Sequence, residues 1–268
     1  MAHPLDGVQD KLDRAVVHLN ALRDEHAAFN PGEFYDTIIE ERAQRDKQGR
    51  IVFDGYLKIL KEPSSQFGIL AGDWAHNLRG GLDHLVYQLA VLDSSGKPPA
   101  GTFFPIARTE SEYLAPGPCG TDSLRDRALA GIIDDHRAPI DAAQPYHKGS
   151  RQIADRQSLS ILNAFANTDK HRLIHRTALR PKHIKVQPLN AQVKVEITVP
   201  AKLRNPIADG TKVYELRFSK VPPNMEVPVN TEFFYELGFG NRGLRLEDLA
   251  RITFEIKAYI NQFRAFWP

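Results

Sequence analysis

Between residues 73 and 84 the sequence gathers side chains that can exchange protons and bind anions. A histidine exchanges a proton near neutral pH, a nearby carboxylate can orient its imidazole, and an arginine binds phosphate through a planar fork of donors. Together these residue types predict a site that handles a proton and an anionic group. The candidate catalytic residues are Arg79, His84, His76 and Asp83, and Asn77 is a candidate substrate contact.

A second polar cluster lies in the string Asn167-Thr-Asp-Lys-His-Arg172, after an apolar helical pattern. The negative end of a helix dipole favours cations, which explains Lys170, His171 and Arg172 without any ligand. It does not explain Asp169, because a carboxylate is unfavourable at that end. Two interpretations stay open: a cation-rich helix end, or a set of substrate contacts formed by Asp169, Lys170, His171 and Arg172.

The first cluster lies on one side of the longest helical pattern in the chain, from about residue 66 to residue 92. This side includes Gly80 and Gly81, and glycines inside a helix cost about 1 kcal/mol each relative to alanine. Close approach of another helix, or of a ligand, would offset that cost. The polar side is therefore either a helix–helix interface bridged by His76, Asn77 and Asp83, or a functional cluster. The opposite side is apolar and predicts the buried face, with Trp74, Leu78, Leu82, Leu85, Val86 and Leu89.

Periodic patterns predict the elements that must position these residues. Helical patterns predict further helices over residues 5–29, about 122–134, 151–168 and 246–266. Two β-rich runs joined by a polar turn predict strands over 34–40 and 50–60, and alternation predicts strands over 192–199, 212–220 and 227–236. The first two strands form a hairpin. The fold class is therefore α+β: a helical bundle in the first two thirds with a β-hairpin insertion, then an antiparallel sheet and a C-terminal packing helix.

This order predicts a mainly helical domain over residues 1–172, which carries the polar clusters. A β-rich region with the last helix follows over residues 173–268 and packs with it as one unit. If the two long helices pack antiparallel or obliquely, their polar clusters can meet. Between the helices, Thr102-Phe-Phe-Pro-Ile106 predicts a buried apolar anchor, and Gln144-Pro-Tyr-His147 predicts a rigid polar turn with a structural role.

Composition bounds the function. The 268 residues carry 35 Lys and Arg against 33 Asp and Glu, and this near balance argues against a broad nucleic-acid surface. The single cysteine, Cys119, cannot form an internal disulfide, and we find neither a secretory signal pattern nor an apolar run long enough to span a membrane. We expect a cytoplasmic protein without a membrane partner.

The string Arg79-Gly-Gly-Leu-Asp-His84 resembles the Arg-x4–6-His motif of the HEPN (higher eukaryotes and prokaryotes nucleotide-binding) superfamily. These are helical domains, often dimeric, and many are metal-independent ribonucleases of bacterial toxin and defence systems. The resemblance implies that Arg79 binds the scissile phosphate, that His84 acts as general acid or base, and that His76 and Asp83 are accessory. It also implies RNA as substrate, a homodimer and no cofactor. Both polar strings together also resemble a set of uncharacterised bacterial proteins.

Spacing sets a condition on this function. Arg79 and His84 lie about 140° apart on an uninterrupted helix, so shared catalysis needs a helix break at Gly80-Gly81 or a partner chain that supplies half of the site.

Two other functions stay open. A metal-dependent hydrolase would use His76 and Asp83 on the helix, with His171 completing a set of nitrogen and oxygen ligands. A non-enzymatic binding or scaffold protein would bury both polar clusters in an interface, within a homodimer.

Overall fold

A computed structural model describes residues 3–28, 34–62, 64–97, 100–171, 177–188, 195–199, 208–219, 229–239 and 244–267. The chain divides into two compact units, each assembled from separate stretches of sequence. A helical unit combines residues 1–24, 68–175 and 246–268, and a sheet unit combines residues 25–67 and 176–245. The chain therefore passes from one unit to the other several times, and the domain boundary expected at residue 172 lies near only one of these passages. The last helix belongs to the helical unit, and the first hairpin belongs to the sheet unit.

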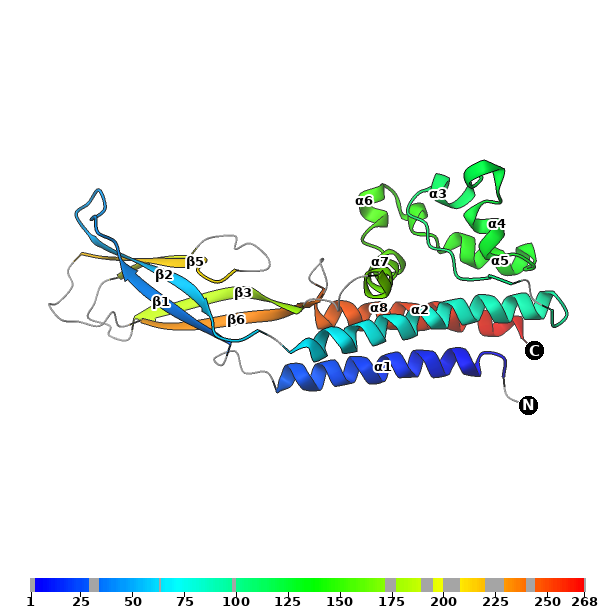
Figure 1. Ribbon diagram of the computed structural model, residues 1–268, viewed down its shortest axis with the longest axis horizontal. Coiled ribbons are helices and arrows are strands. Elements are labelled where there is room, and N and C mark those ends of the chain that lie inside the picture. Colours follow the sequence, from blue (N-terminus) through cyan, green and yellow to red (C-terminus); the bar gives the residue numbers. More distant parts are fainter. Residues whose placement is uncertain are drawn as a thin grey trace. The chain divides into compact units, whose positions relative to one another are not determined.

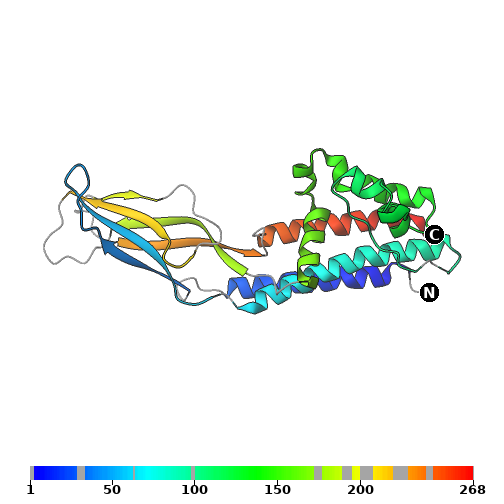
Figure 2. The same cartoon turned by 45° about the horizontal axis from the view of Figure 1, so that its top comes forward.

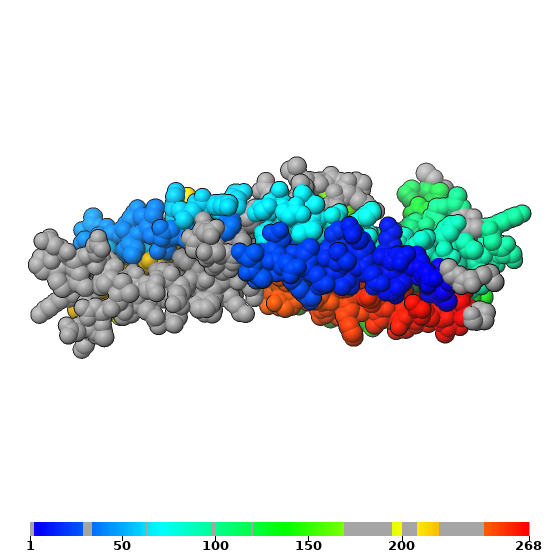
Figure 3. Space-filling view, turned by 90° about the horizontal axis from the view of Figure 1, so that it is seen from below, coloured from blue at the N-terminus to red at the C-terminus, as the bar shows by residue number. Residues whose placement is uncertain are grey.

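Three long helices form the framework of the helical unit: α1 (Asp6–Ala27), α2 (Ser65–Asp93) and α8 (Leu246–Gln262). They run side by side, with α1 antiparallel to α2 (Figures 1 and 2). The indole nitrogen of Trp74 on α2 donates to the Thr253 hydroxyl on α8 at 2.8 Å, and Lys257 on α8 pairs with Asp13 on α1 at 3.0 Å. Figure 3 shows α1 in blue on the surface, with cyan α2 on one side and α8 on the other.

The apolar face predicted for the second helix forms the centre of this unit. Its six residues, Trp74, Leu78, Leu82, Leu85, Val86 and Leu89, have no solvent exposure, so this prediction is confirmed. The predicted apolar anchor is also buried at Phe104, whose ring lies 5.8 Å from that of Tyr259 on α8. Each of the helices α1, α2 and α8 begins within two residues of its predicted first residue.

Shorter helices follow α2 before the chain returns to the sheet unit: α3 (Glu110–Leu114), α4 (Leu124–Ala128), α5 (Asp134–Ala142), α6 (Arg151–Ala154) and α7 (Ser158–His171), with 3-10 turns at Pro118–Gly120 (η2) and Pro145–Lys148 (η3). A further 3-10 turn, Phe263–Phe266 (η4), follows α8. The single helix predicted over 122–134 is wrong. Gly131 adopts a left-handed conformation with φ of +75°, and α5 starts anew where Asp93 accepts the backbone N–H of Ile133 at 2.9 Å. The helix predicted over 151–168 is divided by a turn into α6 and α7.

The sheet unit contains two antiparallel sheets. The four-stranded sheet has the order β1 (Tyr35–Glu41), β2 (Ile51–Ile59), β5 (Lys212–Phe218) and β4 (Val195–Thr198). The second sheet pairs β3 (Thr177–Pro188) with β6 (Val229–Phe239). The predicted hairpin is therefore confirmed as β1–β2, and the fold class is α+β.

Alternation gives the four-stranded sheet an apolar face and a charged face. Phe53, Leu57, Leu216 and Phe218 lie in a buried cluster on the apolar face. Gly55 belongs to the same face, and a Cβ there would come within 2.2 Å of the Tyr214 ring, so this close packing requires glycine. None of the helices in the described parts of the chain is long and apolar enough to cross a membrane.

Candidate functional site

The polar side of α2 separates into two groups that point in different directions. The helix is continuous from Ser65 to Asp93, so Gly80 and Gly81 do not break it. Arg79 and His84 therefore keep the separation of about 140° that an intact helix dictates. Within one chain the first condition for shared catalysis is not met, and a partner chain is the other route to it.

Arg79 lies against the segment that carries Phe104. Its Nη2 donates to the Phe104 carbonyl at 2.6 Å and pairs with the Asp83 carboxylate at 3.0 Å. Asp83 in turn accepts the Phe104 backbone N–H at 2.9 Å. The two side chains thus bind both backbone polar groups of one residue that lies 25 positions from Arg79 along the chain.

The Arg79 side chain is only 11% exposed. Burial lowers the pKa of its guanidinium, and the neighbouring Asp83 carboxylate works in the opposite direction. Its Nη1 is buried and makes no hydrogen bond to the described residues. A cation this enclosed is retained by its partners in the fold rather than displayed to solvent.

His84 faces the start of α1 instead. Its Cε1 lies 3.2 Å from the point where a Cβ on Gly7 would stand, so the absence of a side chain there makes room for the ring. The His84 ring also lies 6.2 Å from that of Tyr87. His76 is exposed, and Asn77 is half-buried, with its amide donating to the Asp73 carbonyl at 2.8 Å.

The two glycines of α2 have different surroundings. A Cβ on Gly81 would lie 3.3 Å from Leu12, which shows that α1 packs closely there. A Cβ on Gly80 would lie no nearer than 3.9 Å to any atom outside its own stretch of helix, and that atom is the flexible Lys11 Cδ. Close packing of α1 therefore explains why residue 81 is a glycine, but it does not explain the glycine at position 80.

The second predicted cluster falls at the edge of the described structure. Asp169, Lys170 and His171 form the last turn of α7, and their side chains lie outside the described residues, as does all of Arg172. Asn167 is exposed on the same helix. The predicted meeting of the two clusters thus stays a prediction. Among the side chains that are described, no three or more His, Cys, Asp or Glu residues gather as metal ligands would.

Gln144 is a central polar residue of the helical unit, although its sequence pattern predicts only a rigid turn with a structural role. It is fully buried, and its oxygen accepts the Ala107 N–H at 3.0 Å. Its amide donates to the carbonyls of Pro105 at 2.9 Å and Ile140 at 3.1 Å. Gln144 therefore holds the Phe104–Ala107 segment from one side, while Arg79 and Asp83 hold it from α2. The only sequence signal for this role is that Gln144 is a polar residue directly before a proline.

Three further polar interactions of the helical unit went unrecognised in the sequence. Asp141 accepts the Tyr113 hydroxyl at 2.6 Å and pairs with Arg125 at 2.7 Å, and both the burial of Tyr113 and this carboxylate raise the pKa of its phenol. His18 on α1 is buried, and burial lowers the pKa of its imidazole while the Asp73 carboxylate opposes the shift. Local patterns of charge did not single out these residues.

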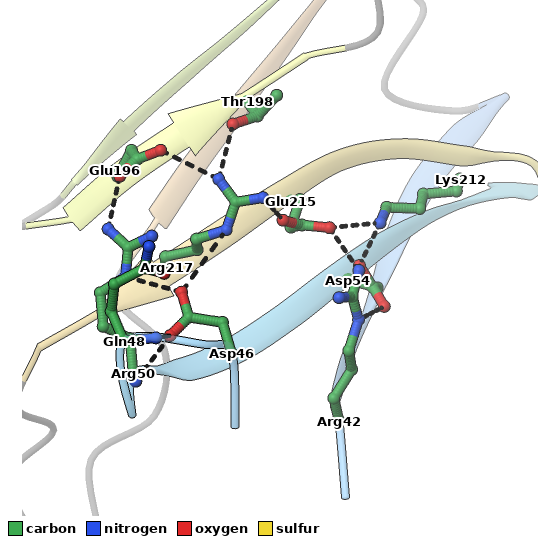
Figure 4. Close-up of polar contacts among 10 residues, drawn as sticks. All are labelled: Arg42, Asp46, Gln48, Arg50, Asp54, Glu196, Thr198, Lys212, Glu215 and Arg217. Atoms are coloured by element: carbon green, nitrogen blue, oxygen red, sulfur yellow. Dashed lines mark hydrogen bonds and ion pairs between the residues drawn. The ribbon is translucent and has the colours of Figure 1, made fainter. Parts of the chain in front are cut away.

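The charged face of the four-stranded sheet carries the densest polar network of the described residues (Figure 4). Asp54 on β2 pairs with Arg42 at 2.7 Å and with Lys212 at 2.6 Å, and Lys212 also pairs with Glu215 at 2.7 Å. Arg217 joins Glu215 to Glu196, the latter at 2.9 Å. Arg50 links Glu196, at 2.5 Å, to Asp46 in the β1–β2 turn, at 2.7 Å.

This network is balanced, because four cations meet four carboxylates: Arg42, Arg50, Lys212 and Arg217 with Asp46, Asp54, Glu196 and Glu215. Each cation pairs with a carboxylate on another strand or turn. The charges therefore serve to join β2, β4, β5 and the turn between β1 and β2, and their sum attracts neither anions nor cations from solution.

The network predicts acid sensitivity of the sheet unit. Hydrogen bonds from the cations lower the pKa of Asp54 and Glu215 below their ordinary values of 3.8 and 4.5. Stability from these carboxylates is complete above the ordinary values and is lost as pH falls through the lower pKa values of the folded state, because the unfolded chain binds protons first. We expect the free energy of unfolding to decrease below about pH 4.5.

Urea unfolding between pH 3 and 7, followed by circular dichroism, measures this decrease. Glu215→Gln removes one of the titrating groups and is expected to give a shallower dependence on pH over the acidic range. Equal slopes for the wild type and the variant would contradict the prediction.

No family model, curated protein or solved structure matches the chain. The polar residues of α2 are divided between an internal clamp, in which Arg79 and Asp83 hold the Phe104–Ala107 segment, and an exposed helix face.

Proposed function

We propose that the chain is a non-enzymatic binding or scaffold protein. The observation that carries this proposal is the engagement of Arg79, which binds the Phe104 carbonyl and Asp83 within the helical unit and is only 11% exposed. An arginine that stabilises a reacting phosphate must present its donors where the phosphate binds. Here the Nη2 donor is used to hold the protein's own backbone.

A binding function also fits the other polar groups. Asp83 and Gln144 are engaged with the same segment, and the eight charges of the network on the four-stranded sheet are paired with each other. Buried polar networks of this kind fix one arrangement of a fold, because each member would be costly to leave unpaired. The helical unit is thereby a rigid support for the residues that α2 leaves at its surface.

The second candidate is the metal-independent endoribonuclease that the HEPN resemblance implies, acting on RNA in a bacterial defence or toxin system. One observation favours it: His76 is exposed and His84 is half-buried, and the two lie about 80° apart on either side of Gly80. Two imidazoles on one face can divide the roles of general base and general acid.

An RNA cleavage assay tests both candidates. The purified protein is incubated with total RNA in EDTA, and the RNA is resolved on a denaturing gel. We expect no cleavage. The variants are His84→Ala and His76→Ala, and the matched control is His26→Ala, which removes a histidine near the end of α1. Cleavage by the wild type and the control that is lost in His84→Ala would overturn the binding function and establish the ribonuclease.

A further inference from the structure

Strand β1 lies at one edge of the four-stranded sheet, and among the described residues it pairs only with β2. Next to the two ends of β1, the Arg42 N–H donates to the Val52 carbonyl and the Leu60 N–H donates to the Phe34 carbonyl, both at 2.8 Å. Hydrogen-bonded pairs alternate along an antiparallel ladder, so the even-numbered residues of β1 bind β2. The backbone N–H and C=O groups of its odd-numbered residues therefore point away from β2, along the outer edge of the sheet.

Every charged side chain of this strand is a carboxylate. Asp36, Glu40 and Glu41 are exposed, and none of the three forms an ion pair with a described residue. The cations nearest to them along the two strands, Arg42 and Lys58, are paired with other carboxylates at 2.7 and 3.7 Å. The edge strand thus carries three negative charges without a cation of their own, in contrast to the balanced network on β2, β4 and β5.

The exposed face of β1 has the pattern acidic, apolar, acidic. Asp36, Ile38 and Glu40 share this face because successive side chains of a strand alternate. The Ile38 side chain is 47% exposed, and the half-buried Tyr56 lies opposite it on β2. On the other face, Ile39 packs against the buried apolar cluster of the sheet. The surface therefore matches an extended segment in which two basic residues flank an apolar residue at alternate positions.

We propose that β1 binds an extended, basic segment of another protein, which adds a fifth strand to the four-stranded sheet. Backbone hydrogen bonds to the outer edge of β1 give the affinity, and ion pairs with Asp36 and Glu40 select lysine or arginine. The inference rests on the proposed binding function and names the chemistry of its partner. It concerns only the sheet unit.

Asp36 already makes a contact that an added strand replaces. Its carboxylate accepts the Thr37 N–H at 2.7 Å, and this N–H is one of the groups that point away from β2. When the basic segment binds, a lysine of the segment pairs with the Asp36 carboxylate, and a backbone carbonyl of the segment accepts the Thr37 N–H. Both groups stay paired in this exchange. An acidic segment would instead bring like charges into contact, which disfavours association.

Fluorescence anisotropy with a labelled peptide tests the docking. The probe is Thr-Lys-Thr-Val-Thr-Lys-Thr, and the matched peptide has glutamate in place of both lysines. We expect saturable binding of the basic peptide and no binding of the acidic one. Asp36→Asn/Glu40→Gln should raise the Kd of the basic peptide at least about tenfold. The control Asp10→Asn/Glu247→Gln makes the same change in net charge at exposed positions of the helical unit, and it should bind like the wild type.

Backbone pairing is tested separately from charge. Glu41→Pro removes an N–H that points away from β2, so it leaves the β1–β2 ladder intact. It should weaken peptide binding about tenfold relative to Glu41→Gln, which removes only the charge. Hydrogen exchange followed by NMR gives a direct readout. The peptide should protect the outward amide of Ile39, whereas the amide of Ile38, already bonded to β2, should change little.

The proposal is overturned if the basic peptide does not bind saturably, or if both charge variants lose the same affinity. Binding that ignores Glu41→Pro and leaves the Ile39 amide unprotected would also overturn it, because the contact would then be charge attraction alone. These outcomes are distinct from failure of the proposed function, which RNA cleavage decides. A protein that binds no peptide and cleaves no RNA refutes only the basic segment as partner. RNA cleavage by a protein that does add the strand refutes only the non-enzymatic function.

Discussion

Asp83→Ala is expected to lower the free energy of unfolding by about 3 kcal/mol, the low end of the range for breaking a buried ion pair because Asp83 is itself one-third exposed. The substitution leaves the Arg79 guanidinium, 11% exposed, without its opposite charge. It also removes the acceptor of the Phe104 N–H, whose hydrogen bond measures 2.9 Å. Urea unfolding followed by tryptophan fluorescence measures the loss, since Trp74 is buried on the same helix.

A second substitution separates charge from packing in this clamp. Arg79→Met combined with Asp83→Ala removes both charges, so it should cost less than the sum of the two single changes. The matched control is Asp10→Ala, which removes an exposed carboxylate from α1 and should change stability by no more than about 0.5 kcal/mol. If Asp83→Ala is as harmless as this control, the clamp does not stabilise the fold, and the main support for a structural Arg79 is lost.

Gln144→Leu is expected to cost about 2–3 kcal/mol, although leucine is similar in size to glutamine. The side chain is fully buried and makes three hydrogen bonds, to Ala107, Pro105 and Ile140. Leucine would leave these backbone groups buried without partners, and an unpaired buried group loses its interaction with water as well as its hydrogen bond. The same unfolding experiment measures the effect.

The chain offers a matched control for this change. Gln157 also donates its amide to a backbone carbonyl, that of Ile153 at 3.1 Å, but on the exposed surface. Gln157→Leu should therefore change stability by no more than about 0.5 kcal/mol, because water can replace the lost hydrogen bond. Equal effects at both positions would show that the Phe104–Ala107 segment does not depend on Gln144.

The long elements could be predicted because their signals are local. An apolar residue on every third or fourth position identifies the core of α2, and all six predicted residues are buried. Two β-rich runs joined by a polar turn identify β1 and β2. Alternation identifies β4 and β5, since successive side chains of a strand point to opposite faces. Where a helix is only a few residues long, these repeats carry less information. The predicted helix over 122–134 was wrong because Gly131 and the contact of Asp93 with Ile133 decide where α4 and α5 lie.

Which polar residues α2 carries, and how far apart they stand around the helix, follow directly from the order of amino acids. Their contacts depend on how distant segments pack. Arg79 meets Phe104, Gln144 meets Ala107, and His84 meets Gly7, each across a long interval of chain. The physical reason is that a helix specifies the direction of each side chain through local geometry, whereas the partner in that direction depends on packing between distant segments. An arginine predicted to bind phosphate thus binds a backbone carbonyl, and Gly80 is left facing outward.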